Sequence, residues 1–320
     1  MSSLITTKDI FKITVPTPFP VGDVNMYLFK GDTLTLVDAG TKTEEAWESF
    51  TQQLSDLGHK PSDIDQVVIT HHHPDHVGFL DYFPAELPVI GHPKNQPWIS
   101  RDEHFFKANK PFYKELFIQL GIDPDLTNMI NMNKELKYSC HRSLTSSVIE
   151  KDSIPGMDGF IVIETPGHAQ SHIGLFREKD GLFLAGDTLL AKISPNPLLE
   201  PPQFGETDRP RPLVQYNESL KKLKTLPLAM VMTGHGEDIN NPFELIEHRL
   251  EEQKKRANQV FQMLREKPMT AFEVCISLFP KVFLKEPVLT MSETVGQLDF
   301  LEELGEIKIE VVNGKYIYHV

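Results

Sequence analysis

The stretch Thr70–Gly78, with the sequence THHHPDHVG, decides how this chain is interpreted. The stretch begins at the last residue of the β-branched segment 66–70, and that segment predicts a largely buried strand. In an extended chain His71 and His73 point to the same side, so their imidazoles can share one metal ion, and the turn at Pro74 then offers Asp75 and His76 to a second ion. Imidazole and carboxylate ligands without thiolates suit a zinc site that keeps open positions for water and substrate.

Three more candidate ligands stand just after predicted strands, each beside a glycine. His168 follows the segment 160–164, Asp187 follows 182–185, and His235 follows 228–232. The backbone can turn tightly at a glycine, so these side chains can reach a shared crevice. A single histidine in such a place is usually structural, but three in the same context predict a metal centre. The candidate ligands are therefore His71, His73, Asp75, His76, His168, Asp187 and His235.

The ordered motifs H-x-H-x-D-H, P-G-H, G-D-T and G-H-G resemble those of the metallo-β-lactamase superfamily, and especially its glyoxalase II-like and lactamase-like hydrolase branches. The resemblance extends over roughly residues 11–237 and implies an α/β fold, a four-layer αββα sandwich with the metals at one edge. It also implies a division of the ligands. The first metal would be held by His71, His73 and His168 and the second by Asp75, His76 and His235, with Asp187 bridging the two.

Two further residues match positions of the superfamily outside its ligand set. Asp38, in the sequence LVDAG, matches an early aspartate, and we expect it to support a ligand histidine from behind and fix its tautomer. The alternative is an ordinary turn residue at a strand end. His172 resembles the second histidine of the glyoxalase-like motif P-G-H-T-x-G-H, a position that is usually structural, although Ala169 and Ser171 depart from that motif.

The length of 320 residues fits either one large domain or a catalytic domain with a smaller appendage. We predict a metallo-β-lactamase domain at residues 1–240, with a helical insertion at about 92–150, followed by a linking helix and a winged-helix-like domain at 241–320. Within the first domain, Thr41 and Glu44 are expected to form a capping box. In the tail, three predicted helices precede two alternating segments around Asn313-Gly314, a typical type I′ hairpin signal.

Charge and composition limit the partners. The formal net charge is −13, and no Lys or Arg occurs between Pro287 and Glu306, so we do not expect DNA binding, and RNA is disfavoured. The tail is instead expected to pack on the active-site edge or to form a homodimer contact. Residues 1–12 lack the basic and apolar regions of a signal peptide, and no apolar run is long enough for a membrane span, so the expected location is cytoplasmic.

The expected activity is metal-dependent hydrolysis. Two divalent ions, Asp75, Asp187 and a bridging hydroxide together leave a formal charge of about +1, which favours anionic or carbonyl-bearing substrates. We expect two zinc ions per chain and attack by the bridging hydroxide, oriented by Asp75, on a small ester, thioester or lactone. Arg209 and Arg211 are candidates for clamping an anionic substrate tail, the alternative being solvated loop charges.

Other functions remain open from the sequence. Iron or manganese can replace zinc in such a ligand set. One alternative function is an endoribonuclease acting on single-stranded RNA, and another is a mononuclear-iron sulfur dioxygenase.

Overall fold

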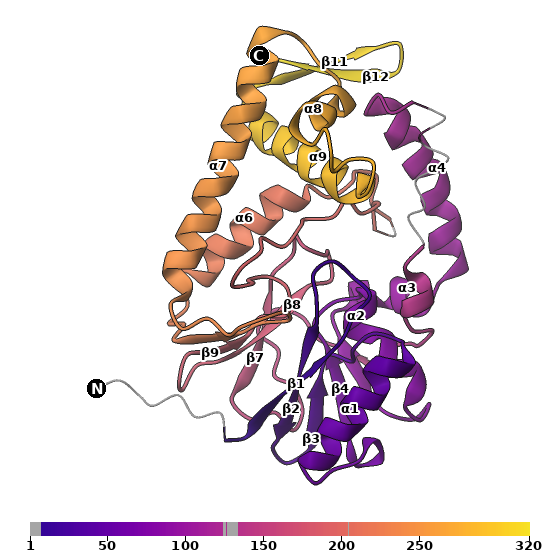
Figure 1. The fold of residues 1–320 in the computed structure, drawn as a ribbon, viewed down its shortest axis with the longest axis vertical. Coiled ribbons are helices and arrows are strands. Elements are labelled where there is room, and N and C mark those ends of the chain that lie inside the picture. Colours follow the sequence, from indigo (N-terminus) through magenta and orange to yellow (C-terminus); the bar gives the residue numbers. More distant parts are fainter. Residues whose placement is uncertain (1–7, 124–125, 127–133, 204) are drawn as a thin grey trace.

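The computed structural model describes residues 8–123, 126, 134–203 and 205–320 (Figure 1). Within these residues, two β-sheets form the centre of the molecule. The first sheet has the strand order β1-β2-β3-β4-β5-β6, with β1 (Ile10–Val15), β2 (Val24–Lys30), β3 (Leu34–Val37), β4 (Gln66–Ile69), β5 (Val89–Gly91) and β6 (Ser146–Ser147). The second has the order β10-β9-β8-β7, with β7 (Phe160–Glu164), β8 (Ile173–Arg177), β9 (Leu182–Leu184) and β10 (Met230–Met232).

The first sheet begins as an antiparallel meander and continues as parallel strands. The strands β1, β2 and β3 pair antiparallel, whereas β3, β4, β5 and β6 pair parallel. Parallel neighbours need a crossover, and helix α1 (Glu44–Asp56) provides it between β3 and β4. The N-cap of α1 is Thr43, whose side chain accepts from the Ala46 amide, so the predicted capping box at Thr41 is wrong. Thr41 is fully buried and its carbonyl accepts from the Thr43 amide.

Apolar side chains fill three successive layers and confirm the predicted αββα sandwich. One cluster packs α1 against the first sheet and includes Phe50 and Leu54. A second lies between the sheets and includes Val68 of the first sheet with Leu175 and Leu184 of the second. The third packs the second sheet against helices on its outer face, α6 (Pro212–Leu223) and the beginning of α7 (Pro242–Glu266). Shorter helical pieces join these elements: α2 (Pro74–Val77), α3 (Gln96–Ile99), η1 (Pro61–Asp63), η2 (Gly78–Tyr82), η3 (Pro93–Asn95) and η4 (Leu136–Tyr138).

After the sandwich, α7 leads to α8 (Ala271–Leu278), α9 (Pro287–Glu303) and the hairpin β11 (Lys308–Val312) and β12 (Lys315–His319). The hairpin turn has positive φ at both Asn313 and Gly314, so the predicted type I′ turn is confirmed. The division into two domains and the winged-helix assignment stay predictions. In the part of the chain that the structure describes, no helix combines the length and the hydropathy that crossing a lipid bilayer requires.

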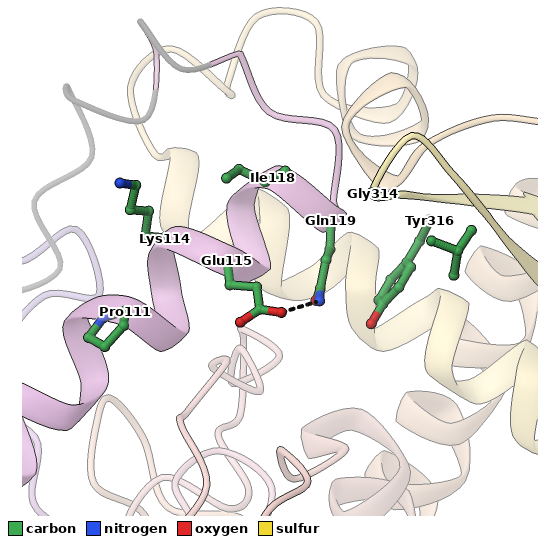
Figure 2. A pocket seen from close by; sticks show the side chains of 8 residues that line it. Pro111, Lys114, Glu115, Ile118, Gln119, Gly314 and Tyr316 are labelled. Atoms are coloured by element: carbon green, nitrogen blue, oxygen red, sulfur yellow. Dashed lines mark hydrogen bonds between the residues drawn. The ribbon is translucent and has the colours of Figure 1, made fainter.

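The predicted insertion contributes a helix to the C-terminal core. Helix α4 (Glu103–Gln119) runs beside α9 and the hairpin on the side away from α7 (Figure 1). Its residues Leu116 and Phe117 share one apolar cluster with Val295 and Tyr318 of the C-terminal region. The outer side of this contact is a shallow groove of about 390 Å³, bordered by Ile118 of α4 and Tyr316 of the hairpin (Figure 2). The insertion and the tail are therefore packed as one unit.

Candidate metal centre

The strand directions bring the seven predicted ligands to one edge of the sandwich. His71 and His73 follow β4, and α2 carries Asp75 and His76. In the second sheet β7, β9 and β10 run in the same direction, because β8 is antiparallel to both β7 and β9, and β10 is parallel to β9. The carboxyl ends of these three strands therefore lie at one edge. His168, Asp187 and His235 follow these ends.

Three groups of side chains among the described residues could each hold a metal ion. They are His71 with His73 and His168, His71 with His76 and Asp187, and Asp75 with His76 and His235. Within each group the ligand atoms lie within 4.8 Å of one another. The groups share His71 and His76, so they form one continuous cluster. The structure thus brings together all seven residues that the sequence singled out.

Asp187 occupies the middle of this cluster. Its Oδ2 lies 3.5 Å from Nε2 of His168 and 3.4 Å from Nε2 of His235. Its Oδ1 lies 3.5 Å from Nε2 of His76. Gly234 makes room for this carboxylate, because a Cβ atom at position 234 would overlap Oδ1 of Asp187. A single carboxylate therefore faces one histidine of the first predicted set and two of the second.

These separations fit a shared metal better than direct hydrogen bonds. Ligand atoms about 2.1 Å from a tetrahedral zinc ion lie about 3.4 Å apart, which is close to the distances around Asp187 and to the 3.4 Å between His235 Nε2 and Asp75 Oδ2. Among the described residues, buried polar atoms without a hydrogen-bond partner include Nε2 of His76, His168 and His235 and Oδ1 of Asp187. Unpaired buried polar atoms are costly, so the convergence of four in one place indicates a site built for cations.

Burial and neighbouring charges shift the pKa values of the histidines at the two ends of the cluster in opposite directions. Burial, together with the neighbouring His76 and His73, holds the pKa of His71 well below its usual value, so this imidazole is neutral and can ligate. Burial also lowers the pKa of His235, but Asp187 and Asp75 outweigh it and raise that pKa to about 10. The end of the cluster that holds Asp75 and His235, with Asp187 beside it, therefore attracts positive charge.

The comparisons with known proteins agree with this geometry. The family model described as "Metallo-beta-lactamase superfamily" matches residues 19–235. The chain belongs to the metallo-β-lactamase superfamily. A Bacillus subtilis (strain 168) relative named "Probable metallo-hydrolase YqjP" is 50% identical over 299 residues, covering 93% of each chain. This chain is accordingly a metallo-hydrolase of the superfamily.

Solved structures show the same fold over nearly the whole chain. The metallo-beta-lactamase family protein TTHA1429 from Thermus thermophilus superposes with a TM-score of 0.82 at 26% identity, covering 98% of both chains. A beta-lactamase domain protein from Burkholderia ambifaria has a TM-score of 0.78 at 20% identity, covering 99% of this chain and 94% of its own. The likeness therefore extends beyond residue 235 into the C-terminal region.

In this metallo-hydrolase, Asp38 lies behind two of the candidate ligands. Its Oδ2 is 2.8 Å from Nδ1 of His76 and accepts a hydrogen bond from Thr70 Oγ1, while its Oδ1 accepts from the Thr70 amide. The Thr70 hydroxyl is in turn 3.0 Å from Nδ1 of His71. The carboxylate thus leaves Nε2 of His76 to face Asp187. Asp38 has a φ of +63°, an uncommon backbone conformation for a residue other than glycine.

His172 lies behind the central carboxylate. Its Nε2 accepts a hydrogen bond from the Asp187 amide at 3.0 Å, and its Nδ1 lies 2.8 Å from Thr165 Oγ1 and 3.0 Å from Thr188 Oγ1. Burial, together with His168, holds the pKa of His172 well below the usual value, so the ring is neutral. A neutral ring can accept at Nε2 only if Nδ1 carries the proton.

Two supporting contacts had no signal in the sequence. Nδ1 of His168 donates to the carbonyl of Asn196 at 3.0 Å, and Nδ1 of His235 donates to the carbonyl of Asp23 at 2.8 Å. Both contacts leave Nε2 facing the cluster. Every residue type has a backbone carbonyl, so neither acceptor could have been identified before the course of these loops was known.

Arg209 and Arg211 have carboxylate partners in helix α9. The guanidinium of Arg209 forms two hydrogen bonds with Asp299, of 2.7 and 2.6 Å. Arg211 contacts Glu302 and Glu303. Asp299 is 3% exposed, so its pair with Arg209 is shielded from water and effectively fixed. These contacts attach the loop before α6 to the C-terminal region.

Proposed function

We propose that this chain binds two zinc ions and hydrolyses a small ester, thioester or lactone. The observation that carries the proposal is the position of Asp187, whose Oδ2 lies within 3.5 Å of both His168 and His235. In the proposed arrangement one ion would be held by His71, His73 and His168 and the other by Asp75, His76 and His235, with Asp187 available to both. The ligand types support zinc, since imidazole and carboxylate groups form open zinc sites in hydrolases.

The proposed chemistry combines the ions with groups that this chain places around them. Divalent ions bound there would supply a water molecule of lowered pKa and Lewis acidity toward a substrate carbonyl. The Asp75 carboxylate lies 3.4 Å from Nε2 of His235, and it can accept a proton from the attacking water. Asp38 and the Asn196 carbonyl fix the tautomers of His76 and His168, so the imidazoles present Nε2 without rotating.

The charges around the site support a small substrate. A substrate polyanion such as RNA needs a basic surface, yet the chain has a net charge of −13. The two candidate clamping arginines, Arg209 and Arg211, pair with acidic residues of α9. We therefore assign Arg209 and Arg211 a structural role rather than a substrate-clamping role.

The test is metal analysis combined with hydrolysis assays. Plasma emission spectrometry on protein purified without an affinity tag or added metal should find about two zinc ions per chain. Asp187→Ala should lose at least one ion and most of the hydrolysis of an aryl acetate, an acyl thioester and a γ-lactone. Asp158→Ala, which alters an exposed carboxylate, is the matched control and should keep both.

Three results would contradict the proposal. A single iron per chain would point to the dioxygenase alternative, and full metal content in Asp187→Ala would remove the central role of that carboxylate. A chain that holds no metal, even after incubation with zinc, would rule out the proposed centre.

A further inference from the structure

The segment from Asn196 to Glu200 lies between the candidate metal centre and the C-terminal region. It follows β9 and Asp187 in the chain and has contacts on both sides. Pro195 and Pro197 flank Asn196, so the backbone here is restricted to extended conformations and its carbonyl has little freedom to turn. The segment is therefore rigid enough for contacts with the C-terminal region to determine where the Asn196 carbonyl lies at the metal centre.

On the metal side, the segment contacts the loop that carries His168. The Asn196 carbonyl accepts from His168 Nδ1 at 3.0 Å, and the Leu198 amide donates to the His168 carbonyl at 3.5 Å. Two residues further on, Oε1 of Glu200 accepts from the Gln170 amide at 2.7 Å. Two hydrogen bonds thus fix the ring and the backbone of His168, and a third fixes the backbone two residues further along the same loop.

On the other side, the same segment is attached to helix α9. Nδ2 of Asn196 donates to the carbonyl of Leu289 at 3.0 Å. The Leu199 amide donates to Oγ of Ser292 at 3.1 Å, and Ser292 is only 1% exposed. The hydrogen bond to Ser292 is buried and has little competition from water, so the segment has a defined place on α9.

We infer that helix α9 positions the metal ligand His168, acting through Asn196 and Ser292. The inference rests on the proposed metal centre and assigns the C-terminal region a part in it. Asn196 and Ser292 are positioning residues, since neither side chain contacts the cluster itself. When its contacts to α9 are lost, the Asn196 carbonyl can move away from His168 Nδ1, and the ring can rotate away from the orientation that aims Nε2 at Asp187.

The test measures zinc affinity in the full-length chain with Asn196→Ala and Ser292→Ala combined. Both substitutions keep all seven candidate ligands and the Asn196 carbonyl. Metal-free protein is titrated with zinc in competition with a chromophoric chelator, which resolves the tighter and the weaker ion. We expect one of the two ions to bind at least about tenfold more weakly than in the unaltered chain, while the other changes little.

Thr294→Ala is the matched control. Thr294 is a fully buried hydroxyl residue of the same helix, and its side chain donates to the Thr290 carbonyl within α9. Thermal unfolding of the metal-free proteins shows how much each change loosens the helix. A general loss of stability should affect the control and the double variant alike, whereas weaker binding of one ion should occur only in the double variant.

Each other result is decisive. Equal zinc affinities in the double variant and Thr294→Ala would overturn the inference while leaving the proposed function intact. An equal weakening of both ions would also overturn it, because it would indicate general loosening rather than the positioning of His168. If the unaltered chain binds no zinc, both the proposed function and this inference are wrong.

Discussion

Nδ1 of His76 lies 2.8 Å from Oδ2 of Asp38, and both side chains are buried. The same carboxylate accepts two hydrogen bonds from Thr70, the residue immediately before His71. One aspartate at the end of β3 therefore orients groups that belong to both proposed metal sites. This relationship leads to a prediction about metal affinity.

Asp38→Asn should weaken zinc binding by about 10-fold to 100-fold, because the amide is a poorer acceptor for His76 and can present its NH₂ group instead. Asparagine tolerates the left-handed backbone at this position, where φ is +63°. Asp38→Ala should lose the same affinity and additional stability, since alanine does not tolerate that backbone well. Chelator competition and thermal unfolding of both variants provide the measurement. If zinc affinity is unchanged in Asp38→Asn, Asp38 does not support the metal ligands and serves only as a turn residue at the end of the strand.

His172→Ala should destabilise the chain even without metal. The substitution leaves a buried cavity and removes the acceptor of the Asp187 amide, so we expect a loss of about 2–4 kcal/mol in the free energy of unfolding. Urea denaturation in the presence of a chelator measures this loss. His104→Ala, at an exposed position of α4, is the control and should change stability by less than about 0.5 kcal/mol. Similar stabilities of the two variants would contradict the role given to His172.

Gly234→Ala should impair the centre without altering any candidate ligand. The added Cβ would overlap Oδ1 of Asp187, so the carboxylate must move and both proposed ions should bind more weakly. Gly236→Ala is the comparison, because it adds a methyl group into open space at a positive φ of 73°. That variant should lose about 1 kcal/mol of stability but keep its metal. Metal analysis of both proteins provides the measurement. If Gly234→Ala retains two ions, Asp187 does not have the central role in metal binding that its position suggests.

Glu200 should make stability depend on pH. Burial raises the pKa of this carboxyl to about 7, and among the described residues its Oε2 has no hydrogen-bond partner. The folded chain therefore holds this proton more tightly than the unfolded chain does. Its contribution to stability is full below the ordinary pKa of the carboxyl and is lost as pH rises through about 7, with an upper limit of about 3 kcal/mol.

Glu200→Gln should remove this dependence and keep the acceptor for the Gln170 amide. Urea denaturation of metal-free protein at several pH values between 4.5 and 8 should show the variant gaining on the unaltered chain as pH rises. Glu178→Gln, at an exposed position, should show no such trend. A constant difference between Glu200→Gln and the unaltered chain at every pH would contradict the raised pKa.

The sequence predicted those features that are encoded by short patterns. His71 and His73 alternate in an extended segment, and Asn313-Gly314 defines its own turn, so both could be placed without knowing the rest of the fold. The strands at β4, β7, β9 and β10 were predicted from their β-branched runs. The strands β1, β2 and β8 were not, although β8 sets the direction of both its neighbours.

Features that depend on long-range packing could not be predicted. Thr41 has the same capping chemistry as Thr43, and only the full burial of Thr41 decides which of them begins α1. Arg209 lies close to Asp187 in sequence, but the structure pairs it with Asp299, 90 residues away. The contact between His168 and the Asn196 carbonyl depends on where α9 lies, and the local sequence contains no information about that.

The packing of α4 against the C-terminal core has a consequence for how the chain folds during its synthesis. Leu116, Phe117 and Leu120 are translated long before Val295 and Tyr318, with which they share an apolar cluster. Until α9 and β12 have left the ribosome, the apolar face of α4 lacks most of its partners and is open to aggregation or to a chaperone. A ribosome stalled near residue 240 would hold all the candidate metal ligands but neither the helix that fixes His168 nor the cover for α4.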